Sequence, residues 1–209
     1  KAEKAEAGRA VSVQHALDFG NATIAEVLAD ELFRGKFVRT GGLGWLKWSG
    51  KYWKACDDSA PVEAVRRYAV KKLVTAVREH GIGSAAAKGW ARYNETGGVT
   101  SVVKFLGGMD GIYRESGELD AWPDLINTPS GVLDLRDFTV TEHSADLLLT
   151  KITKGNYRPG FETKDVTEAL ECVPSDARAW LQTHFGAGVS GRAKPRVPAV
   201  LLTGEPSFH

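Results

Sequence analysis

The chain has 209 residues, of which 43% are hydrophobic and 25% are charged, a composition typical of a folded globular protein rather than a disordered one. No run approaches the roughly 18 apolar residues that a membrane-spanning helix needs, and residues 1–10 lack the apolar core of a signal peptide. We therefore expect a cytoplasmic protein without a membrane partner. Cys56 and Cys172 lie far apart without C-x-x-C spacing, so we expect small core or edge residues rather than a disulfide scaffold.

The formal net charge of +1 hides a strong asymmetry along the chain. Residues 34–104, the basic block, carry 14 lysines and arginines against five acidic residues, a balance of +9. Residues 105–150, the acidic block, carry two against nine, a balance of −7. Such segregation predicts either that the two blocks face each other or that the basic block faces a polyanion. Plain solvation of the lysines remains a third explanation.

The first half of the chain predicts helices around an aromatic hairpin. Residues 1–10 are rich in Ala, Glu and Lys and are expected to form a frayed or disordered lead-in. Asn21 is expected to cap a helix that ends before Gly35. Its apolar positions follow the helical period at Ile24, Val27, Leu28 and Leu32. A short strand at 37–39 precedes a hairpin over residues 45–54, with its turn at Ser49-Gly50-Lys51.

A long basic helix is predicted after the hairpin. Pro61 suits its first turn, and one side of the helix is apolar, at Val62, Val65, Ala69, Leu73, Ala76 and Val77. Arg67, Lys71 and Arg78 fall on the opposite side, with Arg66 and Lys72 flanking the apolar stripe. Two more helices are expected at 85–93 and 99–106, with Gly97-Gly98 and Gly107-Gly108 as helix breakers.

The second half predicts a small strand unit followed by two helices. Strands are expected at 125–126, 132–135 and 139–141, the last two joined by a tight turn. Helices are expected at 164–171 and at 175–185, with Ser175 as the N-cap of the second. The fold class is therefore α+β, helix-dominated, with small antiparallel β-hairpins. We expect one unit at 11–110 and a second at 120–195.

Near the C-terminus, residues 197–205 predict an apolar strand that runs into the start of a phosphate-binding loop at Gly204. Such a loop needs a second glycine, a lysine for the phosphates and a hydroxyl for magnesium. Only Pro206, Ser207, Phe208 and His209 follow. We therefore expect no ATP binding or hydrolysis by this chain. A plain strand that ends at Thr203-Gly204 is the alternative.

Two further groups of residues have competing explanations. Trp45, Trp48 and Trp53 either stack on single-stranded bases or form the cross-strand pairs that a hairpin buries, and we favour core packing. The carboxylates near His143 suggest either turn chemistry, which we favour, or a metal or acid–base site. These carboxylates are Asp134, Asp137, Glu142 and Asp146. The histidines show no H-E-x-x-H or triad pattern, so we predict no metal site and no catalytic residue.

The order of these features resembles the region that precedes the motor in phage and plasmid primase/helicases of the poxvirus D5 type. The resemblance rests on the tryptophan hairpin 45–53, the basic helix, and the segment 122–135, which contains Asn-x-x-x-Gly-x-Leu-Asp-Leu from Asn127 to Leu135. His143, Leu149-Thr150 and Tyr157-Arg158-Pro159 then occupy the places of the family's His, Leu-Thr and Tyr-x-Pro. It covers residues 18–205, although the segment from Trp180 matches only loosely.

The resemblance implies an accessory domain that contacts DNA, mediates oligomerisation or links the helicase motor to a primase in the same polypeptide. It also implies that the intact parent is a superfamily 3 helicase that uses ATP and magnesium, whereas this chain holds no cofactor. The expected DNA-binding residues are Arg66, Arg67, Lys71, Lys72, Arg78, Lys88 and Arg92. The alternatives are a stand-alone adaptor without a nucleic-acid role and, more weakly, a small nuclease or transferase built on the acidic hairpin.

Overall fold

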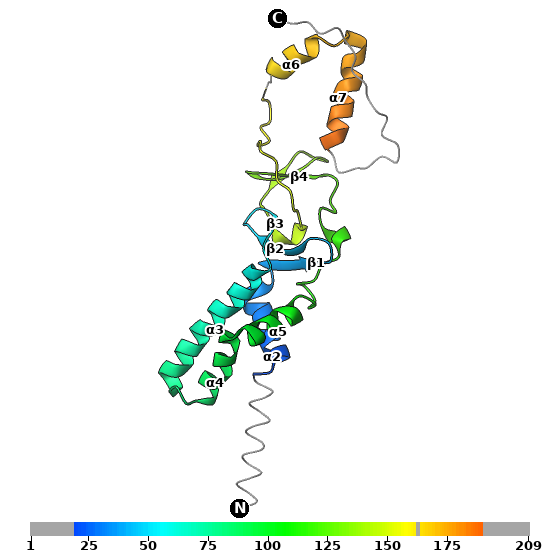
Figure 1. Cartoon of the computed structure of the whole chain (residues 1–209). Helices are drawn as coiled ribbons and strands as arrows, with labels where there is room; N and C mark the ends of the chain where they lie inside the picture. Colours follow the sequence, from blue (N-terminus) through cyan, green and yellow to red (C-terminus); the bar gives the residue numbers. More distant parts are fainter. Residues whose placement is uncertain (1–18, 162–163, 190–209) are drawn as a thin grey trace, which may run out of the picture.

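The computed structural model describes residues 19–161 and 164–189. These residues form an elongated α+β arrangement (Figure 1), with helices at one end, two three-stranded antiparallel sheets in the middle and two further helices at the other end. The predicted fold class is confirmed. The lead-in at 1–10, the strand at 197–205 and the nucleotide-binding candidate Gly204 lie outside the described residues.

The first helix ends before Gly35 as predicted, but its start and its last turn differ from the prediction. Helix α2 (Asn21–Leu28) continues into a π-helical turn, η1 (Ala29–Phe33). Asn21 is the first helical residue rather than the cap, because extended Gly20 precedes the helix and its carbonyl accepts from the N–H of Ile24 at 2.9 Å. Val27, expected on the apolar face, is 38% exposed. The wider π turn instead brings Phe33 fully into the core.

The predicted aromatic hairpin is part of a three-stranded sheet. Strands β1 (Phe37–Thr40), β2 (Gly44–Trp48) and β3 (Trp53–Ala55) pair in that order, with Phe37 opposite Lys47 and Trp48 opposite Trp53. Alternating side chains bury both faces of this sheet. Phe37 and Trp45 pack in the main core with the helices, whereas Val38, Leu46 and Trp53 pack in a second cluster with Leu119, Ala145 and Leu148.

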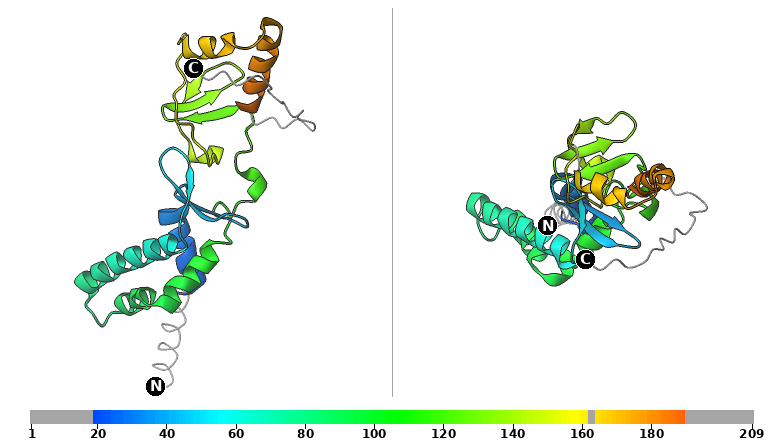
Figure 2. Two further views of the ribbon diagram at one scale, coloured as in Figure 1. Left: turned by 45° about the horizontal axis from the view of Figure 1, so that its top comes forward. Right: turned by 90° about the horizontal axis from the view of Figure 1, so that it is seen from above.

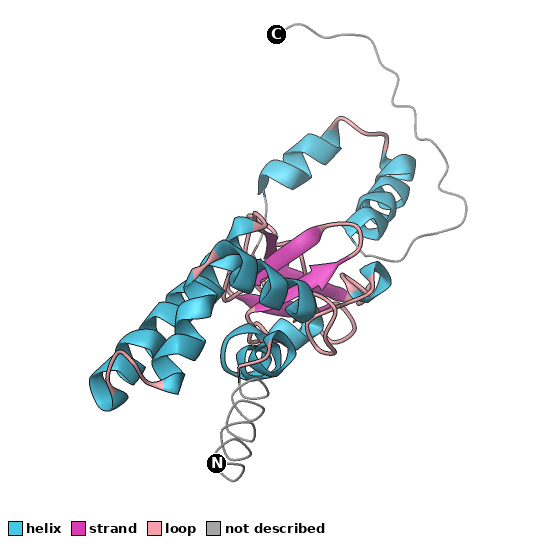
Figure 3. Ribbon diagram, turned by 60° about the horizontal axis from the view of Figure 1, so that its bottom comes forward, coloured by secondary structure: helices cyan, strands magenta, loops and turns pink. Residues whose placement is uncertain are grey.

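Three helices complete the first part of the chain: α3 (Ser59–His80), α4 (Ala85–Ala91) and α5 (Thr96–Leu106), with the short turn η2 (Arg92–Asn94) before α5. Helices α3 and α4 extend side by side away from the strands (Figures 2 and 3). Gly97 and Gly98 lie inside α5, so their predicted role as breakers is wrong. A Cβ on Gly98 would lie 2.3 Å from the carbonyl oxygen of Arg92, so this glycine lets α5 begin against η2.

The second sheet consists of β4 (Leu125–Thr128), β5 (Gly131–Asp134) and β6 (Val140–Thr141), flanked by the short turns η3 (Ser116–Glu118) and η4 (Ala145–Leu147). Helices α6 (Lys164–Glu171) and α7 (Ser175–Val189) follow as predicted. Ser175 is the first helical residue rather than the N-cap, because the carbonyl of Pro174 accepts from Ala177 and Arg178. Cys172 is exposed, whereas Cys56 packs against the main core, where burial raises its pKa.

Hydrogen bonds join the two sheets. The backbone N–H of Trp53 donates to the carbonyl of Leu149 at 2.8 Å, and its indole Nε1 donates to the carbonyl of Ala145 at 2.8 Å. The side-chain amide of Asn127 donates to the carbonyls of Lys51 at 2.9 Å and Lys151 at 3.0 Å. The two bonds of Trp53 and the Asn127–Lys51 bond cross the boundary between the units 11–110 and 120–195, and that division stays a prediction.

Candidate nucleic-acid interface

Two of the predicted DNA-binding residues share one carboxylate. Arg66 Nε and Arg67 Nε each lie 2.7 Å from the Glu63 carboxylate. The two arginines follow Glu63 by three and four residues, so all three side chains lie on the same face of α3. The hydrogen bonds from Arg66 and Arg67 lower the pKa of Glu63 to about 2. Glu63 is therefore ionised at neutral pH and offsets one of the two guanidinium charges, while it holds both side chains in place.

Lys72 belongs to a different local network. Its Nζ lies 3.8 Å from Glu31 Oε2 and 5.1 Å from the centre of the Tyr68 ring. The Tyr68 hydroxyl donates to the same Glu31 carboxylate. Its contact with Tyr68 raises the pKa of Lys72, and burial, followed by the Glu31 contact, raises that of Tyr68. Lys72 thus connects α3 to η1 and is only partly available to a ligand.

The other four predicted residues are exposed cations. Lys71 and Arg78 lie on α3, and Lys88 and Arg92 lie four positions apart on α4 and η2. No ion pair between described residues involves any of these four side chains. Of the seven predicted residues, Arg67 and Lys71 line one cavity together.

That cavity is a groove between α3 and the first sheet, with a volume of about 620 Å³. We call it the α3–sheet groove. Arg67 and Lys71 lie on its helix wall, and Lys36 and Lys47 lie on its sheet wall. Its lining also includes Leu32, Phe37, Trp48, Ala60, Glu63, Ala64 and Tyr68.

Sequence reasoning missed Lys36 and Lys47 as site residues. Lys47 lies directly opposite Phe37 in the β1–β2 register, and its Nζ lies 5.7 Å from the centre of the Phe37 ring. Lys36 precedes β1, and its carbonyl accepts from the N–H of Trp48 at 2.9 Å. A lysine at each of these hairpin positions is visible in the sequence, but the approach of α3 to this end of the sheet is not.

The tryptophans of the hairpin serve mainly to fill the core, as favoured from the sequence. Trp45 and Trp53 are 4% and 2% exposed, so neither ring presents a face to a ligand. Trp48 is half-buried, and its ring centre lies 5.5 Å from that of Trp53. Trp48 also reaches the end of the α3–sheet groove.

Two of the four carboxylates near His143, those of Asp134 and Asp137, make the turn contacts that the sequence favours. Asp134 accepts the backbone N–H of Arg136 at 2.9 Å, and Asp137 accepts that of Thr139 at 3.0 Å. The Arg136 side chain, which also bonds to Asp134, is the main reason that the pKa of Asp134 falls to about 2. His143 Nε2 lies 2.9 Å from the carbonyl of Thr128. Within residues 19–161 and 164–189, no group of three or more His, Cys, Asp or Glu side chains is placed to hold a metal.

The basic and acidic blocks do not neutralise each other through the ion pairs that the described residues form. Arg66 and Arg67 pair with Glu63, and Lys72 lies near Glu31, all on the helical side. Within the acidic block, Arg114 pairs with Glu118 and Arg136 pairs with Asp134. Asp120 pairs with Lys151, which follows the block. Exposed cations of α3 and of the α3–sheet groove therefore have no ion-pair partner among the described residues, namely Lys36, Lys47, Lys71 and Arg78.

No helix in the described part of the chain is both long and apolar enough to span a membrane. A sequence comparison with curated proteins finds no match. The model of the D5 N-terminal-like family matches residues 25–185, which include both sheets and the helices from α3 to α6. This match covers more than half of the chain and confirms the resemblance inferred from the tryptophan hairpin and the Asn127–Leu135 segment. The chain therefore belongs to the D5 N-terminal-like family.

Proposed function

We propose that this chain is a DNA-contacting accessory domain of a phage-type replicative primase/helicase. Family membership supports a role in that class of replication protein. The observation that carries the DNA contact is the set of α3 and groove cations that acidic side chains of this chain leave unmatched, above all Lys71, Lys36 and Lys47. Phosphates are the natural partner of such a surface, because each contact releases condensed counterions.

The wider roles belong to the same proposal. An intact parent of this family type would hydrolyse ATP with magnesium to unwind DNA, and this domain would link its motor subunits or connect them to a primase. Gly204, the residue that the sequence suggests for contact with the nucleotide, lies outside the described residues. The DNA contact is the part of the proposal that this chain can test directly.

The test measures the affinity of the chain for fluorescently labelled DNA by anisotropy over a series of salt concentrations. If three or four cations meet phosphates, log K falls against log salt with a slope of about −2 to −4, and affinity is independent of base sequence. The double variant Arg67→Glu with Lys71→Glu should weaken binding and flatten the slope by roughly two units. Glu63 keeps a partner in this variant, because Arg66 bonds to both of its carboxylate oxygens.

The matched control is Lys154→Glu with Lys164→Glu, which changes the net charge equally at exposed positions outside α3 and the groove. This variant should keep most of the affinity. Equal losses of DNA affinity in the two double variants would show that the α3 cations act only through the net charge of the chain. Absence of DNA binding by the native chain even near about 50 mM salt would reject the proposal, because electrostatic binding is strongest at low salt.

A further inference from the structure

The α3–sheet groove has cations on both of its walls and an apolar floor. Arg67 and Lys71 come from α3, one helical turn apart, whereas Lys36 and Lys47 come from the facing end of the first sheet. The sheet and α3 thus place positive charges from two separate segments of the chain around the same groove. A surface that merely keeps α3 soluble would not place matching charges on the opposite wall.

Small side chains on α3 keep this groove open. Ala60 and Ala64 lie one turn apart on the helix wall, and both line the cavity. Leu32 and Phe37 contribute apolar surface from the other side, and the Tyr68 ring closes part of the floor. The floor can therefore take up flat apolar groups, while the four cations lie along the rim.

Glu63 is the acidic residue in the lining, and it does not cancel the charge of the rim. Both of its carboxylate oxygens accept hydrogen bonds from arginines, and its pKa is lowered to about 2 by them. An anionic ligand therefore meets a carboxylate that is already matched by Arg66 and Arg67. Lys36, Lys47 and Lys71 add three charges that no ion pair between described residues offsets.

We propose that the α3–sheet groove binds a segment of single-stranded nucleic acid, with phosphates along Lys36, Lys47, Arg67 and Lys71 and bases against the apolar floor. This inference rests on the proposed DNA contact and specifies its site and its ligand. A duplex presents phosphates outward and keeps its base faces stacked inside, so it can use the rim but not the floor. A single strand can use both, because base faces pack on apolar and aromatic surfaces regardless of sequence.

The first experiment compares an oligothymidine with a blunt duplex of equal length, each titrated into the native chain and into two charge-reversal variants. Lys36→Glu with Lys47→Glu alters the sheet wall, and Lys154→Glu with Lys164→Glu makes the same change in net charge outside α3 and the groove. We expect the native chain to bind the single strand at least about tenfold more tightly than the duplex. The sheet-wall variant should lose about tenfold or more for the single strand, and the outer variant less than about threefold.

A second variant tests the floor without any change of charge. Ala64→Phe places a ring in the groove and should weaken binding of the oligothymidine while the duplex affinity stays near that of the native chain. Thr75→Phe, an exposed position on the same helix, is the control for the larger side chain. Circular dichroism of each variant reports whether the fold is kept, and the sheet-wall lysine variant decides the matter if Ala64→Phe unfolds.

The possible results distinguish failure of the groove as the binding site from failure of DNA binding itself. Equal affinity for single strand and duplex, or a larger loss in the outer variant than in the sheet-wall variant, overturns the groove assignment while DNA binding stands. Displacement of the oligothymidine by polyglutamate at equal charge concentration also overturns it, because the groove would then bind an acidic peptide. Failure of the native chain to bind either form of DNA rejects the proposed function itself.

Discussion

The two sheets have the same number of strands and the same antiparallel order, yet different forces hold them. The first sheet is buried on both faces, by Phe37 and Trp45 on one side and by Val38, Leu46 and Trp53 on the other. The second sheet has an exposed edge strand, β6, and buries two polar residues, Asn127 and Thr128, in β4. Apolar burial has no preferred direction, whereas buried polar groups need their hydrogen-bond partners in place. Thr128 bonds within its own turn, so the second sheet depends on the first through the hydrogen bond from Asn127 to Lys51, in the turn between β2 and β3.

The largest effect is expected at Trp53, which belongs to the first sheet but contacts the segment that follows the second. Trp53→Ala removes a ring that is 2% exposed and the indole hydrogen bond to the carbonyl of Ala145. The free energy of unfolding should fall by about 3–5 kcal/mol, as for other buried aromatic truncations. Chemical denaturation followed by circular dichroism measures this loss.

Trp122→Ala is the control for Trp53→Ala, because the Trp122 ring is 54% exposed. It should change stability by less than about 0.5 kcal/mol. A similar small change at Trp53 would show that the packing between the two sheets contributes little to stability.

Asn127→Ala tests the polar connection of the second sheet. The variant leaves the carbonyls of Lys51 and Lys151 without the amide donor that each now has. We expect a loss of about 1–3 kcal/mol in the free energy of unfolding, because buried acceptors lose their partners. Asn127→Asp should cost more, because it places a carboxylate against two carbonyl oxygens. Thermal melts of both variants, with exposed Asn156→Ala as the control, distinguish this role from a loss of volume.

Substitutions at Gly98 and at neighbouring Gly97 test the close packing of α5 against η2. Gly98→Ala brings a methyl group to 2.3 Å from the Arg92 carbonyl oxygen and should cost about 1–3 kcal/mol. Gly97 has nothing within 4 Å of the same position, so Gly97→Ala should be neutral or stabilise α5 by up to about 1 kcal/mol. Equal melting temperatures for the two variants would mean that η2 moves away without cost.

Local patterns predicted most elements of this fold, because each depends on periodicity within a few residues. The apolar spacing from Val65 to Ala76 defines α3, and alternation around Trp45 defines β2. The positions that were predicted wrongly depend on neighbours that lie beyond the few residues of a local pattern. Gly98 looks like a breaker until η2 is known to lie against it, and Asn21 looks like a cap until Gly20 is seen to be extended.

The candidate site was predicted only in part for the same reason. The α3 cations Arg67 and Lys71 follow from the helical pattern, but Lys36 and Lys47 join them only through the packing of α3 against the sheet. The partners of Asn127 also escaped prediction. Its amide bridges one carbonyl 76 residues earlier and another 24 residues later, which no local pattern reveals.

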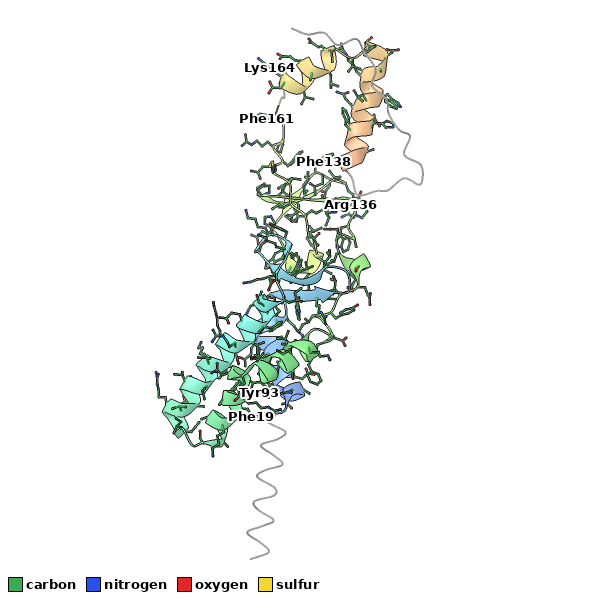
Figure 4. The ribbon with its side chains drawn as sticks, viewed as in Figure 1. Phe19, Tyr93, Arg136, Phe138, Phe161 and Lys164 are labelled. Atoms are coloured by element: carbon green, nitrogen blue, oxygen red, sulfur yellow. The ribbon has the colours of Figure 1, made fainter. Side chains whose placement is uncertain are left out.

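The smallest expected effect concerns the charge of Asp134 at the exposed turn of the second sheet, where Figure 4 labels Arg136 and Phe138. Hydrogen bonds from the Arg136 side chain and N–H lower the pKa of Asp134 from 3.8 to about 2 in the folded chain. Because the folded pKa is the lower one, the stabilising contribution is fully present above about pH 4 and is lost as the pH falls toward 2.

Asp134→Asn removes the charge but keeps an oxygen that can accept the Arg136 N–H. Its melting temperature should therefore lie slightly below that of the native chain at neutral pH, and the difference should shrink as the pH falls toward 2. Added salt should also shrink it, because the Arg136 side chain is exposed. The comparison between the two chains cancels the parallel titration of Glu63, which both share. A difference that stays constant from neutral pH to pH 2 would assign the role of Asp134 to its hydrogen bonds alone.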